Sequence, residues 1–214
     1  MKAAVLESFD APLVMHRLPS PEPTGRGAVI RVHANGICRS DWHAWKGHWP
    51  GLFPLPHVLG HEMAGVVEEV GSEVMRFRQG DRVIVPFIGG DGGCHWCQLG
   101  LPNLCNHPVM PGFKSWGAYG EYVAVDHADH NLIALPESIT YKAAAGMGCR
   151  YMTAFHAVIE RARAAAGEWL VVYGCGGVGL SVIEIAASIG AAVIAVDINA
   201  EKLDVAKRLG AVAT

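Results

Sequence analysis

The chain has 214 residues, of which 51% are hydrophobic and 17% are charged. This composition suits one large domain or two small ones with packed cores, and it excludes a highly charged disordered chain. The formal net charge of −3 offers no basic surface for nucleic acid or for an anionic membrane.

The first 135 residues have the pattern of a β-rich domain. Short runs of β-branched and small apolar residues at 28–34, 65–70, 82–85 and 119–125 are separated by Gly, Pro and Asp turns, which is typical of strands. Residues 40–48 are predicted to form a short helix. Residues 89–111 contain three Cys and little apolar periodicity, so we predict a loop that needs an external link such as a metal.

The pattern changes after residue 141. Residues 142–147 and 150–166 have helical composition, and they are followed by a buried strand at 169–173, a helix at 177–189, a second strand at 192–196 and a helix at 201–209. This βαβα alternation predicts the start of an α/β doubly wound domain with a parallel sheet. We place the boundary near residue 150, which gives domains at 1–150 and 151–214. A third strand is expected to begin at Thr214, so we expect either a fragment or a sheet completed from elsewhere.

Neither terminal targeting nor membrane insertion is indicated. Residues 1–12 contain two acids and no long apolar core, unlike a signal peptide. Residues 169–196 are long enough to span a bilayer but are interrupted by five glycines. We therefore expect a cytoplasmic protein, in which six unevenly spaced Cys indicate metal binding or catalysis rather than disulfides.

A glycine-rich turn lies between the first strand and helix of the second domain. Its members are Gly174, Cys175, Gly176, Gly177, Val178 and Gly179, which fit the G-x-G-x-x-G pattern of dinucleotide-binding turns. Asp197 ends the next strand, where a carboxylate would accept hydrogen bonds from ribose and repel a 2′-phosphate, so NAD is favoured over NADP. Lys202 is either a contact to the adenosine ribose or a solvated lysine, and Cys175 is expected to be a small buried residue.

A compact group of potential metal ligands lies in the 89–111 loop. Cys94, Cys97 and Cys105 have a spacing that allows three thiolates to meet at one tetrahedral zinc. Asp91 is the preferred fourth ligand, with His95 and His107 as rivals. A reduced, metal-free cluster is the alternative.

A dispersed second group consists of Cys38, His61 and Cys149. No spacing rule connects ligands so far apart, and each residue could instead be buried for packing or hydrogen bonding. Their neighbours favour a metal, because Cys38 is followed by Ser40, Asp41 and His43, and His61 by Glu62. Metal-binding histidines usually need such carboxylates.

These motifs together resemble the zinc-dependent alcohol dehydrogenases of the medium-chain dehydrogenase/reductase superfamily. The motifs that carry the resemblance are GICRSDWH at 36–43, GHEMAG at 60–65, the three-Cys loop, CRYMTA at 149–154 and the glycine-rich turn, and they occur in the family's order over the whole chain. The resemblance implies a GroES-like catalytic domain followed by a Rossmann domain.

The resemblance also implies roles for individual residues. It assigns Cys38, His61 and Cys149 to a catalytic zinc, with Glu62 and Asp41 beside them. It further implies a proton relay through Ser40 and His43, a pyrophosphate contact at Arg39 and a nicotinamide neighbour at Thr153. Ser40 could instead only cap the short helix, His43 could be a surface histidine and Arg39 a solvated arginine.

Two departures from the family pattern stand out. Asp91 replaces the first of four Cys in the structural zinc loop, and the relatives are considerably longer. A group of large apolar residues, most of them aromatic, follows the first ligand and could equally line an apolar substrate pocket or form ordinary core; it comprises Trp42, Trp45, Trp49, Leu52 and Phe53.

The predicted function is therefore hydride transfer between a small alcohol, giving an aldehyde or ketone, and NAD, with zinc acting as a Lewis acid and His43 passing the proton toward solvent. A homo-oligomer, a dimer or tetramer, is expected if the chain is complete. The alternative is a truncated, non-catalytic zinc-binding module or pseudoenzyme. A metal-free quinone reductase relative is disfavoured because Cys38, His61 and Cys149 are all present.

Overall fold

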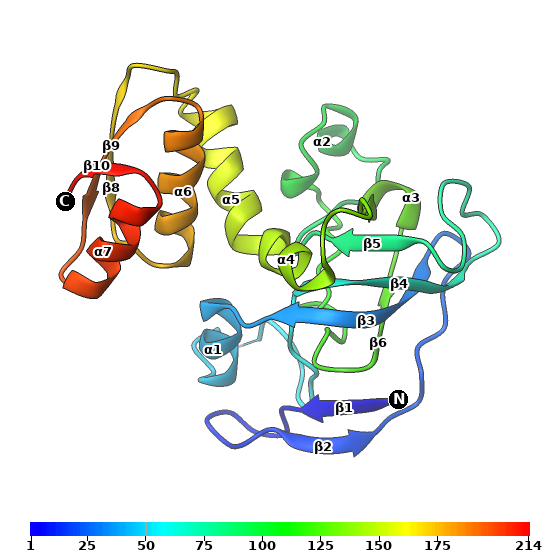
Figure 1. The fold of residues 1–214 in the computed structure, drawn as a ribbon. Coiled ribbons are helices and arrows are strands. Elements are labelled where there is room, and N and C mark those ends of the chain that lie inside the picture. Colours follow the sequence, from blue (N-terminus) through cyan, green and yellow to red (C-terminus); the bar gives the residue numbers. More distant parts are fainter. Residues whose placement is uncertain (50) are drawn as a thin grey trace. The chain divides into compact units, whose positions relative to one another are not determined.

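The computed structural model describes residues 1–49 and 51–214. The chain divides into two compact units, Met1–Cys149 and Arg150–Thr214, each with its own core (Figure 1). The predicted boundary near residue 150 lies where the composition changes from strand-rich to helical.

The first unit is built on an antiparallel sheet. Its strands follow the order β6-β3-β4-β5-β7, with bounds β3 Ala28–Gly36, β4 Glu62–Val70, β5 Arg82–Val85, β6 Tyr122–Val125 and β7 Ile133–Ala134. Ile30 of β3, Met63 of β4 and Val83 of β5 are fully buried in one hydrophobic core, because side chains along a strand point alternately to its two faces. A separate hairpin of β1 (Lys2–Val5) and β2 (Val14–Arg17), which the sequence pattern missed, pairs antiparallel.

Several of the predicted strand bounds are displaced. The predicted strands at 28–34 and 65–70 are parts of the longer strands β3 and β4. Pairing between β3 and β4 continues beyond the predicted bounds, where Asn35 pairs with Met63 and Gly36 pairs with Glu62. The 119–125 run is a strand only from Tyr122 onward. Apolar periodicity marks the buried part of a strand, whereas the backbone ladder decides where it ends.

Short helices occupy the connections of the first unit. They are α1 (Arg39–Trp45), α2 (His95–Gln98), the 3₁₀ turn η1 (Pro102–Leu104), α3 (Ala128–Asn131) and α4 (Tyr141–Gly146). The helix predicted at 40–48 ends early, at Trp45, because Gly47 adopts a positive φ of 70°. The loop predicted at 89–111 is also more ordered than expected, since it contains α2 and η1 and is closed by a bridge between Gly89 and Val109.

The second unit has a parallel sheet with the order β10-β9-β8, and Figure 1 shows it with α6 and α7. Its elements are α5 (Met152–Phe155), the π-helical segment η3 (His156–Arg161), β8 (Trp169–Tyr173), α6 (Gly177–Ser188), β9 (Ala192–Val196), α7 (Ala200–Arg208) and β10 (Ala211–Ala213). The alternation predicted from the sequence is therefore present, but the prediction that the strand at 169–173 is buried was wrong, because Trp169, Val171 and Tyr173 of β8 are exposed.

Two expectations about this unit were wrong. The third strand, β10, is already formed at Ala211–Ala213 rather than beginning at Thr214. The helical segment predicted to reach residue 166 ends at Arg161, and Arg163 has a left-handed φ of 52° that cannot continue a helix. Among the described residues, no helix is both long enough and apolar enough to cross a bilayer.

Candidate metal centre and dinucleotide-binding turn

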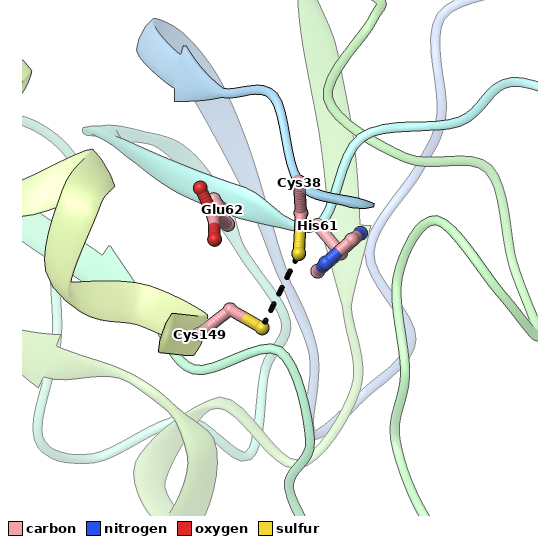
Figure 2. Close-up of side chains that lie close together, drawn as sticks. All are labelled: Cys38, His61, Glu62 and Cys149. Atoms are coloured by element: carbon pink, nitrogen blue, oxygen red, sulfur yellow. Dashed lines mark hydrogen bonds between the residues drawn. The ribbon is translucent and has the colours of Figure 1, made fainter. Parts of the chain in front are cut away.

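Four potential ligands from three separate segments meet in the first unit. Cys38 is the N-cap residue of α1, His61 and Glu62 lie at the start of β4, and Cys149 belongs to the π-helical turn η2 (Met147–Tyr151). One ligand atom from each residue lies within 4.8 Å of all the others, and the two sulfur atoms are 3.9 Å apart (Figure 2). The tertiary fold thus brings together the dispersed group that no sequence spacing could connect.

The imidazole of His61 is oriented by Asp41. Its Nδ1 lies 3.0 Å from Asp41 Oδ1, and both side chains are almost completely buried. Its other nitrogen, Nε2, is buried and has no hydrogen-bond partner within the part of the chain that the structure describes. A buried nitrogen left without a partner is costly, so this atom is suited to a metal ion.

Asp41 also holds the backbone around the ligands. Its Oδ2 accepts a hydrogen bond from the amide of Cys38 at 2.8 Å, and its Oδ1 accepts one from the amide of Gly60 at 3.2 Å. One carboxylate therefore connects the segment that carries Cys38 with the segment that carries His61.

The electrostatics of the group favour the forms that bind a metal. The hydrogen bond with Cys149, together with His61 and the backbone amide of Ser40, lowers the pKa of the Cys38 thiol to about 3 despite burial. Burial lowers the pKa of His61, but Asp41 and Cys38 outweigh it and raise that pKa to about 9. A thiolate beside an imidazolium is the state of these side chains without a metal, and a divalent cation would take the place of the imidazole proton.

The donor set fits zinc. Two sulfur donors and one imidazole nitrogen match the Cys₂His ligands of a catalytic zinc with an open fourth position, and the fully buried Glu62 carboxylate lies in the same group. The sequence placed Glu62 beside the metal ligands, and the structure brings its carboxylate into the cluster itself.

The loop at 89–111 forms a second group. Potential ligand atoms of Asp91, Cys94, Cys97 and Cys105 all lie within 4.8 Å of one another, and the sulfur atoms of Cys94 and Cys105 are 3.6 Å apart. Backbone amides of Asp91 and His107 point at the sulfur of Cys105, at 3.4 and 3.3 Å. Such N–H groups stabilise thiolates, which is the form that binds zinc.

Asp91 is better placed in this loop than its two histidine rivals. Its Oδ1 accepts hydrogen bonds from the amides of Gly93 and Cys94 at 2.9 and 2.8 Å, and these amides hold the pKa of its carboxyl well below the usual range. His107 lies 3.1 Å from Asp91 Oδ2 but is not part of the four-residue group, and the ring of His95 packs against Trp96 instead.

The glycine-rich turn lies in the second unit, between β8 and α6. Gly174 has a φ of 90°, and a Cβ at Gly179 would collide with the carbonyl oxygen of Gly174. The backbone can therefore turn tightly from strand to helix only because these positions carry no side chain. Cys175 is 1% exposed, as a small buried residue, whereas Val178 is largely exposed on the first turn of α6.

Asp197 lies at the end of β9 and contacts this turn. Its Oδ2 accepts a hydrogen bond from the amide of Cys175 at 2.7 Å, and its Oδ1 accepts one from the amide of Asn199 at 2.9 Å. These amides lower the pKa of its carboxyl, so it is ionised at neutral pH. Lys202 Nζ is 3.9 Å from Oδ2 of the same carboxylate. Thr153 is exposed on α5.

Helix α1 carries the predicted relay residues. Ser40 and His43 are three positions apart and so share one side of the helix, but no hydrogen bond joins them among the residues described. Instead, His43 Nδ1 lies 2.9 Å from Nδ1 of His48, a residue that sequence reasoning did not single out. Arg39 packs its guanidinium over the ring of Trp42, 3.9 Å from the ring centroid.

The aromatic residues after Cys38 divide between two environments. Trp45, Trp49 and Phe53 pack with buried Leu6, Ala44 and Leu59, so most of the group is core. Trp42 and Trp45 also line a hollow of about 260 Å³, with Leu13, Ile37, Asp41, Leu59 and Tyr119. Leu52 is 38% exposed and is not part of that hollow.

Comparison with known proteins defines the class. Residues 25–137 match the alcohol dehydrogenase GroES-like domain family, so the chain belongs to that family. The fold and the motif order place it among the alcohol dehydrogenases of the medium-chain dehydrogenase/reductase superfamily, as the sequence resemblance predicted.

Individual relatives agree with this assignment. The chain is 37% identical over 212 residues to an alcohol dehydrogenase of Geobacillus stearothermophilus, and 37% identical over 220 residues to an NAD-dependent alcohol dehydrogenase of Sulfurisphaera tokodaii. It covers 62% of each of these relatives, and 99% of this chain is matched. Among solved structures, an alcohol dehydrogenase from Thermus sp. ATN1 superimposes with a TM-score of 0.93 at 32% identity, over the whole of this chain and 63% of that one.

Proposed function

We propose that this chain carries the metal centre and the first part of the cofactor site of a zinc-dependent oxidoreductase, which transfers hydride between an alcohol and NAD and yields an aldehyde or ketone. The observation that carries the proposal is the meeting of Cys38, His61 and Cys149, with His61 Nε2 buried and unpartnered among the described residues. The family of the chain supports the reaction class.

Each protein group has a defined task in this proposal. Cys38, His61 and Cys149 hold the zinc, Asp41 fixes the ring of His61, and Glu62 supplies a carboxylate beside the ligands. Zinc bound there supplies a Lewis acid that lowers the pKa of an alcohol. Ser40 and His43, on one side of α1, then carry the alcohol's proton toward solvent.

The second unit binds the cofactor. The glycine-rich turn and the N-terminus of α6 accept the pyrophosphate, and Asp197 accepts hydrogen bonds from the ribose hydroxyls. Lys202 contributes at the ribose, and Arg39 and Thr153 are assigned to the pyrophosphate and the nicotinamide. Asp91, Cys94, Cys97 and Cys105 hold a second, structural zinc.

The experiment compares metal content with activity in the purified protein. We expect two zinc ions per chain and alcohol-dependent reduction of NAD. Cys149→Ser should lose one zinc and lower kcat/KM by on the order of 10³, because several kcal/mol of transition-state stabilisation disappear. Cys175→Ala is the matched control, since Cys175 is an equally buried thiol in the core of the second unit.

Three outcomes separate the candidate functions. Loss of one zinc together with activity in Cys149→Ser, but not in Cys175→Ala, supports the proposal. Full activity in zinc-free protein contradicts it. Two bound zinc ions without NAD reduction for a panel of primary and secondary alcohols and polyols would show a non-catalytic metal-binding module instead.

A further inference from the structure

The C-terminal end of α1 brings two histidines together. The amide of His48 donates to the carbonyl of His43 at 3.0 Å, and the amide of Gly47 donates to the carbonyl of Ala44 at 3.0 Å. These two hydrogen bonds form a Schellman motif, which ends a helix and places the residue after the left-handed glycine beside the third helical residue from the end. In many proteins that contact is apolar, and in this chain both positions are histidine.

The turn that creates this contact is tightly determined. Gly47 has a φ of 70°, a region that residues with a Cβ rarely adopt. A Cβ at position 47 would also lie 2.8 Å from Cγ of Phe9, a ring atom that packs against the turn. The backbone therefore delivers His48 to His43 as a consequence of how α1 ends.

The two rings meet through their Nδ1 atoms, which are 2.9 Å apart. At this distance one nitrogen donates a hydrogen bond and the other accepts it, so one proton lies between the two Nδ1 atoms. The ring of Trp42 packs edge-on against both imidazoles, with centroids 5.0 Å from His43 and 5.2 Å from His48. Trp49 packs on one member of the pair, His43, with the two ring centroids 5.5 Å apart. The rings are thus held in place by two indoles.

The surroundings of the pair contain few charges. The nearby charged groups are Arg39, whose guanidinium lies over Trp42, and Lys46, whose ammonium is paired with Asp10 and packs over Trp45. The groups in ring contact with His43 are Trp42, Trp49 and His48. His48 is therefore the group in this set whose hydrogen bond with His43 can strengthen when His43 gains a proton.

We propose that His48 is a positioning residue for His43: it accepts the hydrogen bond from Nδ1 of His43 and so leaves Nε2 as the nitrogen that exchanges the reaction's proton. This inference rests on the proposed function, in which His43 takes the alcohol's proton. It adds a third member to the relay, and that member comes from the end of α1 rather than from the family motif at 36–43.

The proton balance of the pair is simple. At rest, neutral His43 carries its proton on Nδ1 and donates a hydrogen bond from that atom to neutral His48. When a proton arrives, a bond forms between it and Nε2 of His43, and the resulting imidazolium continues to donate from Nδ1 to His48. The proton is later lost from Nε2 to water, and the starting state returns. His48 stabilises the charged intermediate state because a hydrogen bond from an ionised donor is stronger than one from a neutral donor.

The experiment uses two opposite substitutions at one position. His48→Ala removes the acceptor and so destabilises the protonated form of His43. His48→Asp replaces a neutral acceptor with a carboxylate and so stabilises that form. The side-chain pKa and tautomer of His43 are measured by nitrogen NMR across a pH titration, and a His43→Gln sample assigns the resonances.

The same variants are tested by the pH dependence of kcat for alcohol oxidation. Because His43 must be neutral to accept a proton, the acid limb should move to lower pH in His48→Ala and to higher pH in His48→Asp. Lys46→Ala is the matched control, since Lys46 lies in the same turn but does not contact the imidazole pair, and it should leave both the pKa of His43 and the profile nearly unchanged.

The outcomes are distinguishable. Opposite shifts in the two variants, with Nδ1 protonated in the neutral form of His43, support the proposal. An unmoved pKa, or a shift of the same sign in both variants, overturns it, because a purely structural role would not depend on the charge of the new side chain. Opposite NMR shifts in a protein that reduces no NAD would support the histidine pair while contradicting the proposed function.

Discussion

Asp41 is the residue on which the metal centre depends most after the ligands themselves. It is 4% exposed, and its two carboxylate oxygens contact the backbone of Cys38 and Gly60 and the ring of His61. Because a buried carboxylate costs free energy unless it is paired and hydrogen-bonded, these three contacts compensate for its burial. They also set which nitrogen of His61 faces the other ligands.

Replacing Asp41 should therefore affect both stability and metal affinity. Asp41→Ala leaves two buried amides and an imidazole without an acceptor, and should lower the free energy of unfolding by about 2–4 kcal/mol. Asp41→Asn keeps one acceptor oxygen and should retain most of the stability while still weakening zinc binding by about 10–100-fold. Urea denaturation and competition with a zinc chelator measure the two effects. Equal zinc affinity in Asp41→Asn and wild type would show that Asp41 supports the backbone alone.

At the scale of elements, the loop from Gly89 to Pro111 illustrates how a segment with little apolar content is ordered. Its helical structure consists of the short α2 and η1, and Cys97 and Cys105 are among its buried residues. Asp91 contributes twice, since its Oδ1 closes a turn with the amides of Gly93 and Cys94 while its carboxylate also lies with the three thiols. Turn formation and ligation can therefore be separated by substitution.

Two substitutions at Asp91 make this separation. Asp91→Asn preserves the turn, since the amide oxygen can still accept from Gly93 and Cys94, but removes the negative ligand. Asp91→Cys supplies a fourth thiolate. We expect the loop's zinc to be lost more easily to a chelator in Asp91→Asn and less easily in Asp91→Cys, as measured by zinc content after graded chelation. An unchanged zinc count and release rate in both variants would remove Asp91 from the site.

The connection between β9 and α7 determines the expected cofactor preference. Asp197 is ionised and directly hydrogen-bonded to the glycine-rich turn, so in the proposed cofactor site its charge would repel a 2′-phosphate. Asp197→Asn should raise the ratio of kcat/KM for NADP to that for NAD by roughly tenfold, the equivalent of about 1.4 kcal/mol. Asp204→Asn, which removes an exposed acid from α7, is the control. An unaltered cofactor ratio in Asp197→Asn would exclude repulsion by this carboxylate.

At the scale of the whole molecule, the chain contains two cores that are built on different principles. The first unit packs side chains of an antiparallel sheet, whereas the second packs residues of a parallel sheet together with residues of its helices. The proposed metal ligands Cys38, His61 and Cys149 all belong to the first unit. Damage to one core should therefore be separable from damage to the other.

A cavity in each core tests this separation. Ile183 is fully buried in α6 of the second unit, and Met63 is fully buried in β4 of the first. Each should lose about 2–5 kcal/mol of stability on substitution by alanine. In Ile183→Ala, hydrogen exchange should speed up in β8, α6 and β9 while zinc content stays at two per chain. In Met63→Ala, the faster exchange should fall in β3, β4 and β5. Uniform acceleration in both variants would show a single cooperative unit instead.

Much of the fold could be read from local pattern. The βαβα series of the second unit appears in the sequence because its strands are continuous apolar runs and glycines mark the ends of the helices between them. Burial did not follow from these runs, since Trp169, Val171 and Tyr173 of β8 are exposed. The β1–β2 hairpin was missed, because its strands are short and partly exposed and carry no clear alternation. The end of α1 was placed too late, since apolar composition continues through Trp49 while Gly47 already reverses the chain.

The sequence by itself determined the chemistry available to this protein: the thiols of the compact loop, the glycine-rich turn and its acid lie close enough along the chain for spacing to carry the inference. Only the tertiary structure decided the rest. Cys38 caps a helix, His61 precedes a strand and Cys149 lies in a π-helical turn. The pairing of β3 with β4 and the Asp41 hydrogen bonds bring Cys38 and His61 together, while the amide of Phe87 donates to the carbonyl of Gly148 beside Cys149. The contact between His43 and His48 likewise follows from how a helix ends, since the backbone hydrogen bonds of the turn, rather than any motif, bring the two rings together.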